Sequence, residues 1–113
     1  MTVTTKIGFG KKVTGEVAIL GREPDLAGKI VIAPAVVGRE FLEKATLLGV
    51  AGLVVPSLHW RDYEYFRKAD EYPILLLLKF GRLDPSDDLV AKLEKLAGKK
   101  AILDGENHEL KAD

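Results

Sequence analysis

Three stretches of the chain follow the same order: an unbroken run of aliphatic residues, then a turn, then a segment with helical spacing. The aliphatic runs occupy residues 30–32, 53–55 and 74–77. None of them alternates with polar residues, and such runs are typical of parallel strands that are buried on both faces. Because strands and helices alternate along the chain, we predict βαβ crossovers, with the three runs as neighbours in one parallel layer.

The segment after the first run has the spacing and the end signal of a helix. Phe41, Leu42, Ala45 and Leu48 recur at intervals of three and four residues, which predicts one buried stripe. Gly49 follows directly, and a glycine at this place can adopt the left-handed conformation that ends many helices.

The segment after the third run predicts a helix that begins near Asp84. Asp84 is expected to cap it and Pro85 suits its first position. Acidic residues follow at 87 and 88, near the positive end of the helix dipole. The leucines at 89, 93 and 96 form its apolar stripe, and Gly98 is expected to end it.

The second run is followed by an aromatic segment whose helix we expect to start at Ser57. At about 100° per residue, the side chains of His59, Trp60, Tyr63 and Phe66 share an arc of roughly 120°. We expect this arc to pack against the sheet.

Tyr65 points away from that arc, to the solvent side of the same helix, together with Arg61 and other charged residues. Exposed tyrosine and arginine side chains are common anchors in protein interfaces. We therefore predict that Tyr65 and Arg61 belong to a surface through which the chain forms a homodimer or binds a larger protein partner. The alternative is an exposed tyrosine among solvated charges, with no partner.

Both ends of the chain predict further strands. Residues 2–20 alternate apolar and polar positions, which suits a hairpin with Gly8 and Gly10 at its turn. Residues 99–112 predict two short strands around a turn at Asp104 and Gly105. The expected fold is a single α/β domain, 1–113, in which an antiparallel β layer from the N- and C-terminal strands frames a small parallel βαβ core with helices.

Length and composition support a packed domain and argue against several classes of function. The 113 residues are 47% apolar, and Lys plus Arg balance Asp plus Glu at 17 each. A net charge of zero argues against nucleic-acid binding, in which a basic excess neutralises the phosphates. No apolar run approaches the roughly 20 residues that cross a bilayer, and no signal-peptide pattern opens the chain. We expect a cytoplasmic protein with neither a membrane nor a nucleic-acid partner.

Missing residue types bear on chemistry and habitat. Cysteine is absent, which excludes disulfides and thiolate metal sites. With two histidines and no paired acids in apolar surroundings, we predict no metal, no cofactor and no catalytic residue, and favour a protein that is not an enzyme. Glutamine is also absent and Asn107 is the sole asparagine. This depletion, with heavy use of Lys and Glu, is typical of a thermophile.

The stretches LAGKIVIAPAVV, FLEKATLLGVAGLVVP, YPILLLL and GKKAILDGENHEL resemble the swivelling β/β/α domain. That family includes the phosphohistidine domain of phosphoenolpyruvate-utilising enzymes and the protease-associated domain, and the likeness runs from about Val13 to the end. In the phosphohistidine domain a glycine-rich turn and a Ser-His pair follow the second strand. His59 occupies about that place, although the glycines are missing and Leu58 separates Ser57 from His59. The chain is also similar to uncharacterised prokaryotic proteins, a likeness that carries no function across.

A ligand site in such a fold is expected outside the carboxyl ends of the parallel strands. Three loops meet there, at residues 33–39, 56–60 and 79–84, and two of them lead into helix N-termini that suit an anion. The side chains predicted to bind a small anionic ligand are Arg39, Ser57, His59, Lys79 and Arg82. The alternative for the cationic ones is plain solvation at the surface.

These observations favour a small thermostable binding or assembly module, which self-associates or docks onto a larger protein. One alternative follows from the resemblance: a phosphohistidine-like carrier, or a small subunit that completes a partner enzyme's active site, with His59, Arg39 and Ser57 near the ligand. As a phosphoryl acceptor, His59 would need an available ring nitrogen and cationic neighbours. The other alternative is a binder of small anionic ligands at the strand-end loops.

Overall fold

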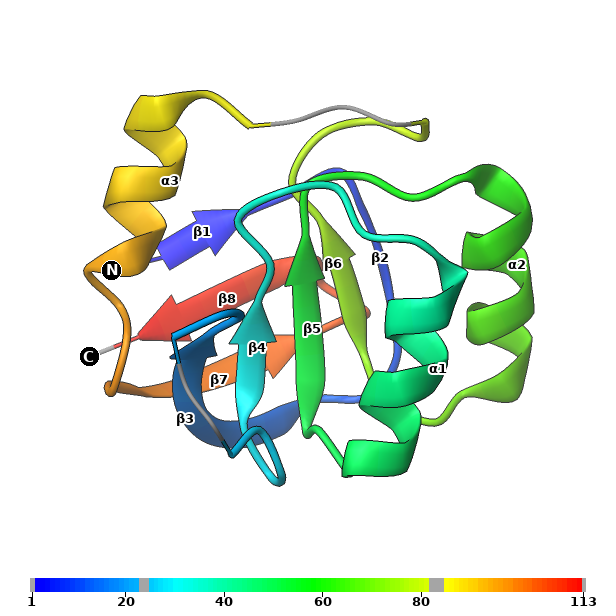
Figure 1. Ribbon diagram of the computed structural model, residues 1–113, viewed down its shortest axis with the longest axis horizontal. Coiled ribbons are helices and arrows are strands. Elements are labelled where there is room, and N and C mark those ends of the chain that lie inside the picture. Colours follow the sequence, from blue (N-terminus) through cyan, green and yellow to red (C-terminus); the bar gives the residue numbers. More distant parts are fainter. Residues whose placement is uncertain (1, 23–24, 82–84, 113) are drawn as a thin grey trace.

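The computed structural model describes residues 2–22, 25–81 and 85–112, and these ranges form a mixed α/β fold with a curled sheet (Figure 1). The strands are β1 (Thr2–Thr4), β2 (Ile7–Phe9), β3 (Val13–Ile19), β4 (Ile30–Ile32), β5 (Gly52–Val55), β6 (Ile74–Leu76), β7 (Lys100–Asp104) and β8 (Glu109–Ala112). The helices are α1 (Arg39–Leu48), α2 (Trp60–Ala69) and α3 (Asp87–Glu94). The strands form one sheet in the order β1-β8-β7-β3-β4-β5-β6-β2.

The three aliphatic runs lie side by side as parallel strands, which confirms the predicted core. β4 pairs with β5 in the register Ile30↔Gly52, and β5 pairs with β6 in the register Leu53↔Ile74. Every residue of these three strands is buried. Successive side chains of a strand point to opposite faces, so a strand without polar residues needs a cover on both faces.

Helices cover one face of the parallel strands, and antiparallel strands with α3 cover the other (Figure 1). On the first face, α1 and α2 contribute Leu42 and Phe66 to the core. On the second face, α3, β7 and β8 contribute Leu93, Leu103 and Leu110. The expected antiparallel layer is therefore present, and each face of the parallel strands has its own apolar core. None of the three helices in the described ranges is long and apolar enough to cross a membrane.

β3 joins the two parts of the sheet. Its first half, residues 13–16, pairs antiparallel with β7, and its second half, residues 17–19, pairs parallel with β4. Gly15 lies in the first half, where a side chain would begin 3.0 Å from the carbonyl oxygen of Gly28. The absence of a side chain at Gly15 thus lets the loop before β4 pass close to the strand.

The hairpin predicted for residues 2–20 is wrong. This segment forms three strands that do not pair with one another: β1 pairs with β8, β2 with β6, and β3 with β7 and β4. Gly8 lies inside β2, where a Cβ would approach Leu75 to 2.6 Å, so it is a close-packing position and not a turn. Gly10, at φ 101°, does follow a strand end and packs on Pro73. Alternation indicated extended chain in this segment, but it did not place the strand ends, and it carries no information about which strand each one pairs with.

Helix ends agree with the prediction for α1 and differ for α2 and α3. Gly49 ends α1 in the left-handed conformation, at φ 75°. α2 begins at Trp60 and not at Ser57, because the backbone of residues 56–58 is still bonded to the loop after β6: the N–H of Leu78 donates to the carbonyl of Pro56 at 2.9 Å and the N–H of Gly81 to the carbonyl of Leu58 at 2.8 Å. α3 is capped by Ser86, whose hydroxyl accepts from the N–H of Leu89. Pro85 precedes this helix, and Asp84 lies outside the described residues.

The aromatic arc predicted for α2 is confirmed only in part. Phe66 is buried and Tyr63 is half-buried, with its hydroxyl donating to the carbonyl of Gly8 at 3.3 Å. Trp60 is 55% exposed, because it stands in the first turn of the helix, about 120° around the axis from Phe66. Tyr65 lies on the solvent side, as predicted.

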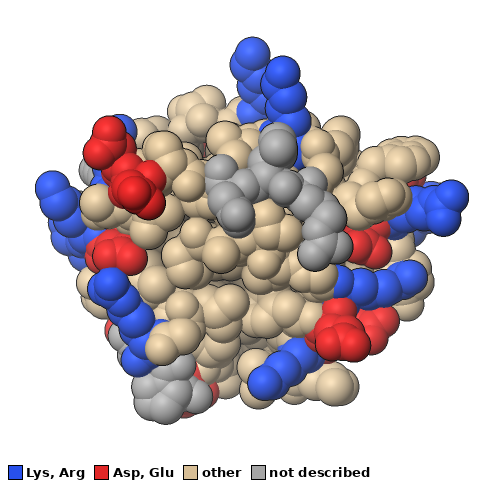
Figure 2. Space-filling model, turned by 45° about the horizontal axis from the view of Figure 1, so that its top comes forward, with Lys and Arg blue, Asp and Glu red and all other residues tan. Residues whose placement is uncertain are grey.

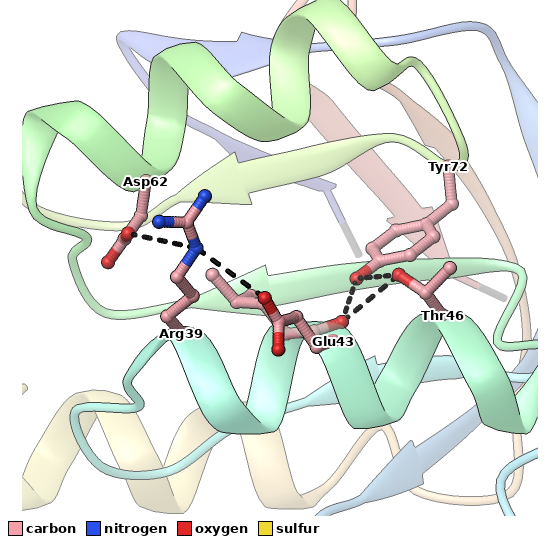
Figure 3. Close-up of polar contacts among 6 residues, drawn as sticks. Arg39, Glu43, Thr46, Asp62 and Tyr72 are labelled. Atoms are coloured by element: carbon pink, nitrogen blue, oxygen red, sulfur yellow. Dashed lines mark hydrogen bonds and ion pairs between the residues drawn. The ribbon is translucent and has the colours of Figure 1, made fainter.

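A buried tyrosine connects α1 to the loop before β6. The hydroxyl of Tyr72 donates to the carbonyl of Leu42 at 2.8 Å, and the hydroxyl of Thr46 donates to the same oxygen at 3.1 Å (Figure 3). Burial raises the pKa of Tyr72, which keeps its hydroxyl protonated as a donor. This contact holds α1 in place beside α2.

The turn between β7 and β8 is held by an aspartate. The turn spans residues 105–108 and directly follows Asp104, where the sequence predicted a turn at Asp104 and Gly105. The Asp104 carboxylate accepts from the side chain of Asn107 at 2.8 Å and from its backbone N–H at 3.1 Å. Lys12 lies 3.9 Å away. These partners, the Asn107 amide first, lower the pKa of Asp104.

We expect Asp104 to contribute a stability that is lost in acid. A group whose pKa is lower in the folded chain stabilises the fold above its unfolded pKa, and this contribution disappears as the pH falls through the folded value. The unfolding free energies of wild type and Asp104→Asn should therefore differ by a constant amount at neutral pH and converge below about pH 3.8. Urea titrations at a series of pH values measure this difference. Glu106→Gln, an exposed change in the same turn, is the control. A difference between wild type and Asp104→Asn that does not vary with pH would contradict the role of the carboxylate.

Candidate functional site

The predicted ligand site lies at the end of the molecule toward which β4, β5 and β6 point, at the top of Figure 1. Three loops, at residues 33–38, 56–59 and 77–81, meet there. Figure 2 turns this end toward the reader: uncharged residues occupy much of the middle of the face, and charged side chains stand around its margin. We call this end of the molecule the rim.

The predicted ligand-binding residues that the structure describes, Arg39, Ser57, His59 and Lys79, do not converge on one point. Ser57 is fully buried, so its hydroxyl does not reach the surface. Arg39, His59 and Lys79 are exposed, and within the described part of the chain no contact joins any two of them. Arg82 lies outside the described residues. The described cationic side chains at the rim therefore stand apart from one another and do not form one shared site.

His59 has a structural role as the N-cap of α2. Its ring atom Nδ1 accepts a hydrogen bond from the backbone N–H of Arg61 at 3.1 Å. In a neutral imidazole one nitrogen accepts and the other donates, so Nε2 carries the proton in this arrangement. That nitrogen then has no lone pair to offer to a phosphoryl group. Across the described residues, no group of three or more His, Cys, Asp or Glu side chains is placed to hold a metal ion.

Arg39 belongs to the contact between α1 and α2. Its Nε lies 3.6 Å from Glu43 and 4.0 Å from Asp62 (Figure 3). The guanidinium carbon also stands 4.2 Å from the centre of the Tyr65 ring. Two carboxylates and an aromatic face thus share the charge of Arg39, which reduces its availability to an external anion.

Exposed apolar side chains gather beside this contact. Leu47 of α1 is 89% exposed and Tyr65 of α2 is 52% exposed. Both line one shallow depression of about 270 Å³ between the helices, together with Glu43, Thr46, Ala69 and Glu71. We use the term helix surface for this depression together with the exposed residues of α1 and α2 around it. The sequence analysis predicted Tyr65 as a surface residue but did not single out Leu47. Leu47 lies outside the predicted apolar stripe of α1, so its position on the helix already implies that it is exposed.

A second hollow, of about 510 Å³, opens at the rim. Its lining residues are Thr4, Thr5, Lys6, Leu77, Leu78 and Lys79. Only Lys79 was among the predicted ligand-binding residues. The others from the N-terminal segment were missed because the expected hairpin placed that segment elsewhere, and no local signal in the sequence indicates that residues 4–6 lie beside residues 77–79.

Comparison with known proteins adds no relative: no protein-family model, curated protein or solved structure matches the chain.

Proposed function

We propose that this chain is an assembly module that self-associates through the helix surface and performs no catalytic step of its own. The observation that carries the proposal is that Leu47 and Tyr65 are large, exposed and line the same depression. Apolar and aromatic side chains that cluster in this way are the usual centres of protein interfaces, in contrast to single exposed hydrophobic residues.

The aromatic anchor is held in position before any partner arrives. Tyr65 contacts the ring of Phe66 in an edge arrangement, with ring centres 5.0 Å apart, and the Arg39 guanidinium covers it. Arg39 is in turn held by Glu43 and Asp62. Because these side chains already have a fixed geometry, binding costs less conformational entropy than for a free tyrosine.

The charges of the helix surface favour a second copy as the partner. The exposed charges of α1 are Glu40 and Glu43 beside Arg39 and Lys44, whereas those of α2 are Arg61, Arg67 and Lys68. α1 and α2 run in the same direction, away from the rim (Figure 1). A two-fold axis parallel to these helices keeps their direction, so α1 of one copy meets α2 of the other in parallel and its glutamates lie near Arg61 of the second copy. Opposite charges then meet in both halves of a symmetric interface.

The arrangement of layers supports a further part of the proposal, that the fold is of the swivelling β/β/α type. Helices α1 and α2 lie over the parallel strands, and the antiparallel strands lie beneath them. β3 takes part in both sheet portions. The composition supports a thermophilic source for the module.

Amide chemical shifts recorded from micromolar to millimolar concentration test the proposed surface. We expect concentration-dependent shifts at residues 40–47 and 61–71, because association changes the surroundings of these amides. The outer face of β7 and β8 serves as the internal control, since Ile102 is also exposed there. Shifts confined to β7 and β8, or none across the range, would contradict the proposal.

A further inference from the structure

The hollow at the rim forms where two paired strands separate. β2 and β6 are antiparallel, and their pairing ends at Ile7↔Leu76. If the pairing continued, Lys6 would lie opposite Leu77 and Thr4 opposite Lys79. Instead the chain turns away, and Thr4 pairs with Glu109 of β8. The two segments diverge, and the hollow opens between them.

Hydrogen bonds of the backbone, and one from the Thr5 hydroxyl, fix both walls of this hollow. On one side, the N–H of Thr5 donates to the carbonyl of His108 at 2.8 Å, and its hydroxyl donates to the carbonyl of Ile7 at 3.2 Å. On the other side, the N–H of Leu77 donates to the carbonyl of Val55 and the N–H of Leu78 donates to the carbonyl of Pro56, both at 2.9 Å. The walls are thus shaped in advance, which lowers the cost of binding a ligand.

Within the described ranges, no ion pair balances the positive charge in the hollow. Lys6 and Lys79 are exposed, and neither has an ion-pair partner among the residues that the structure describes. Some cations are paired, such as Arg22 with Glu94 and Lys111 with Glu109, but many exposed lysines are not, and the distinguishing feature of Lys6 and Lys79 is that both line one hollow. Among the residues that the structure describes, no carboxylate lines the hollow. Two ammonium groups in one concavity raise the local concentration of anions.

The remaining lining residues indicate the rest of the ligand. Leu77 and Leu78 are half-buried and supply apolar contact area. Thr4 is exposed and its hydroxyl has no hydrogen-bond partner within the described ranges, so it is available to donate. The combination suits a small molecule with an anionic oxygen head group on an apolar body.

We propose that the hollow lined by Lys6, Lys79, Thr4 and the two leucines binds small organic phosphates or carboxylates. Lys6 and Lys79 contact the head group, Thr4 donates to it, and the body lies on Leu77 and Leu78. A phosphate monoester is preferred, because its charge near −2 matches the two ammonium groups, whereas a carboxylate carries one charge.

Titration of the chain with phenyl phosphate, benzoate and inorganic phosphate, followed by amide chemical shifts, tests this site. We expect shifts at residues 4–6 and 77–79, and an affinity that falls in the order phenyl phosphate, inorganic phosphate, benzoate. Lys6→Ala and Lys79→Ala should each weaken phenyl phosphate binding by about tenfold, as loss of one charge-assisted contact implies. Lys100→Ala, an exposed lysine on β7, is the matched control and should leave affinity unchanged.

Three outcomes would overturn the site: no saturable binding of any probe, shifts centred on Arg39 and His59, or equal effects of the three lysine variants. Tightest binding by benzoate would overturn the preference for phosphate. The hollow and the helix surface share no lining residue. A variant at Leu47 can therefore be titrated with the same probes: the proposed site predicts unchanged binding in this variant, whether or not the chain self-associates.

Discussion

Replacement of Gly105 with alanine is expected to prevent stable folding. A Cβ at this position would fall inside the van der Waals distance of the Phe9 carbonyl group and 2.7 Å from the carbonyl oxygen of Gly10. These are backbone atoms, so no side-chain rotation relieves the overlap. The β7–β8 turn would have to move away from the segment after β2. We expect a loss of at least about 4 kcal/mol, which is close to the whole stability of many small domains.

Urea unfolding followed by circular dichroism measures this loss. Gly38→Ala is the matched control, because a Cβ at Gly38 meets nothing within 4 Å and its φ of −105° suits any residue. The control should remain within about 1 kcal/mol of wild type. A Gly105→Ala variant as stable as the control would show that the close approach of the turn to Phe9 is absent in solution.

Leu47→Lys is expected to give a folded monomer. The side chain of Leu47 is 89% exposed, so its replacement removes no core contact. Lysine in the last turn of α1, four residues after Glu43, is also favourable for the helix. An interface anchor contributes about 2 kcal/mol, and a two-fold interface contains it twice, so the dimer should weaken on the order of 1,000-fold.

Light scattering at matched concentrations measures this change. Ile102→Lys makes the same replacement at an exposed aliphatic position on β7 and should leave the dimer intact. A Leu47→Lys variant that associates as tightly as Ile102→Lys would remove the helix surface from the interface.

The parallel core was predictable from sequence because its strands have no polar side. Val31, Leu53 and Ile74 face one way and their neighbours along each strand face the other, yet all are fully buried. Only a layer covered on both faces accommodates such runs. Gly49 was predictable for a similar reason, since the left-handed end of α1 favours glycine.

Strand pairing at the N-terminus was not predictable in the same way. β1 and β2 are neighbours along the chain, yet they occupy opposite ends of the strand order. Alternation at residues 2–9 describes only which side chains face a core. The choice of β6 and β8 as partners depends on long-range packing, such as Gly8 against Leu75.

The candidate sites differ in the same way: features determined by local spacing were predictable from the sequence, and features determined by tertiary contacts were not. Tyr65 was found from its phase on a single helix, which local spacing determines. The Arg39 contact with Tyr65 joins two helices, and the hollow between Lys6 and Lys79 joins segments more than 70 residues apart. Both depend on tertiary structure. The start of α2 was misplaced because the strand pairing of Pro56 extends past β5 and makes His59 a cap.

Self-association through the helix surface is tested most directly by sedimentation equilibrium of the wild-type chain over a range of concentrations. We predict a mass that rises with concentration from 12.4 kDa to twice that value, as for a monomer in equilibrium with a two-fold dimer. A mass of 12.4 kDa at every concentration, up to the millimolar range, would contradict the proposed function.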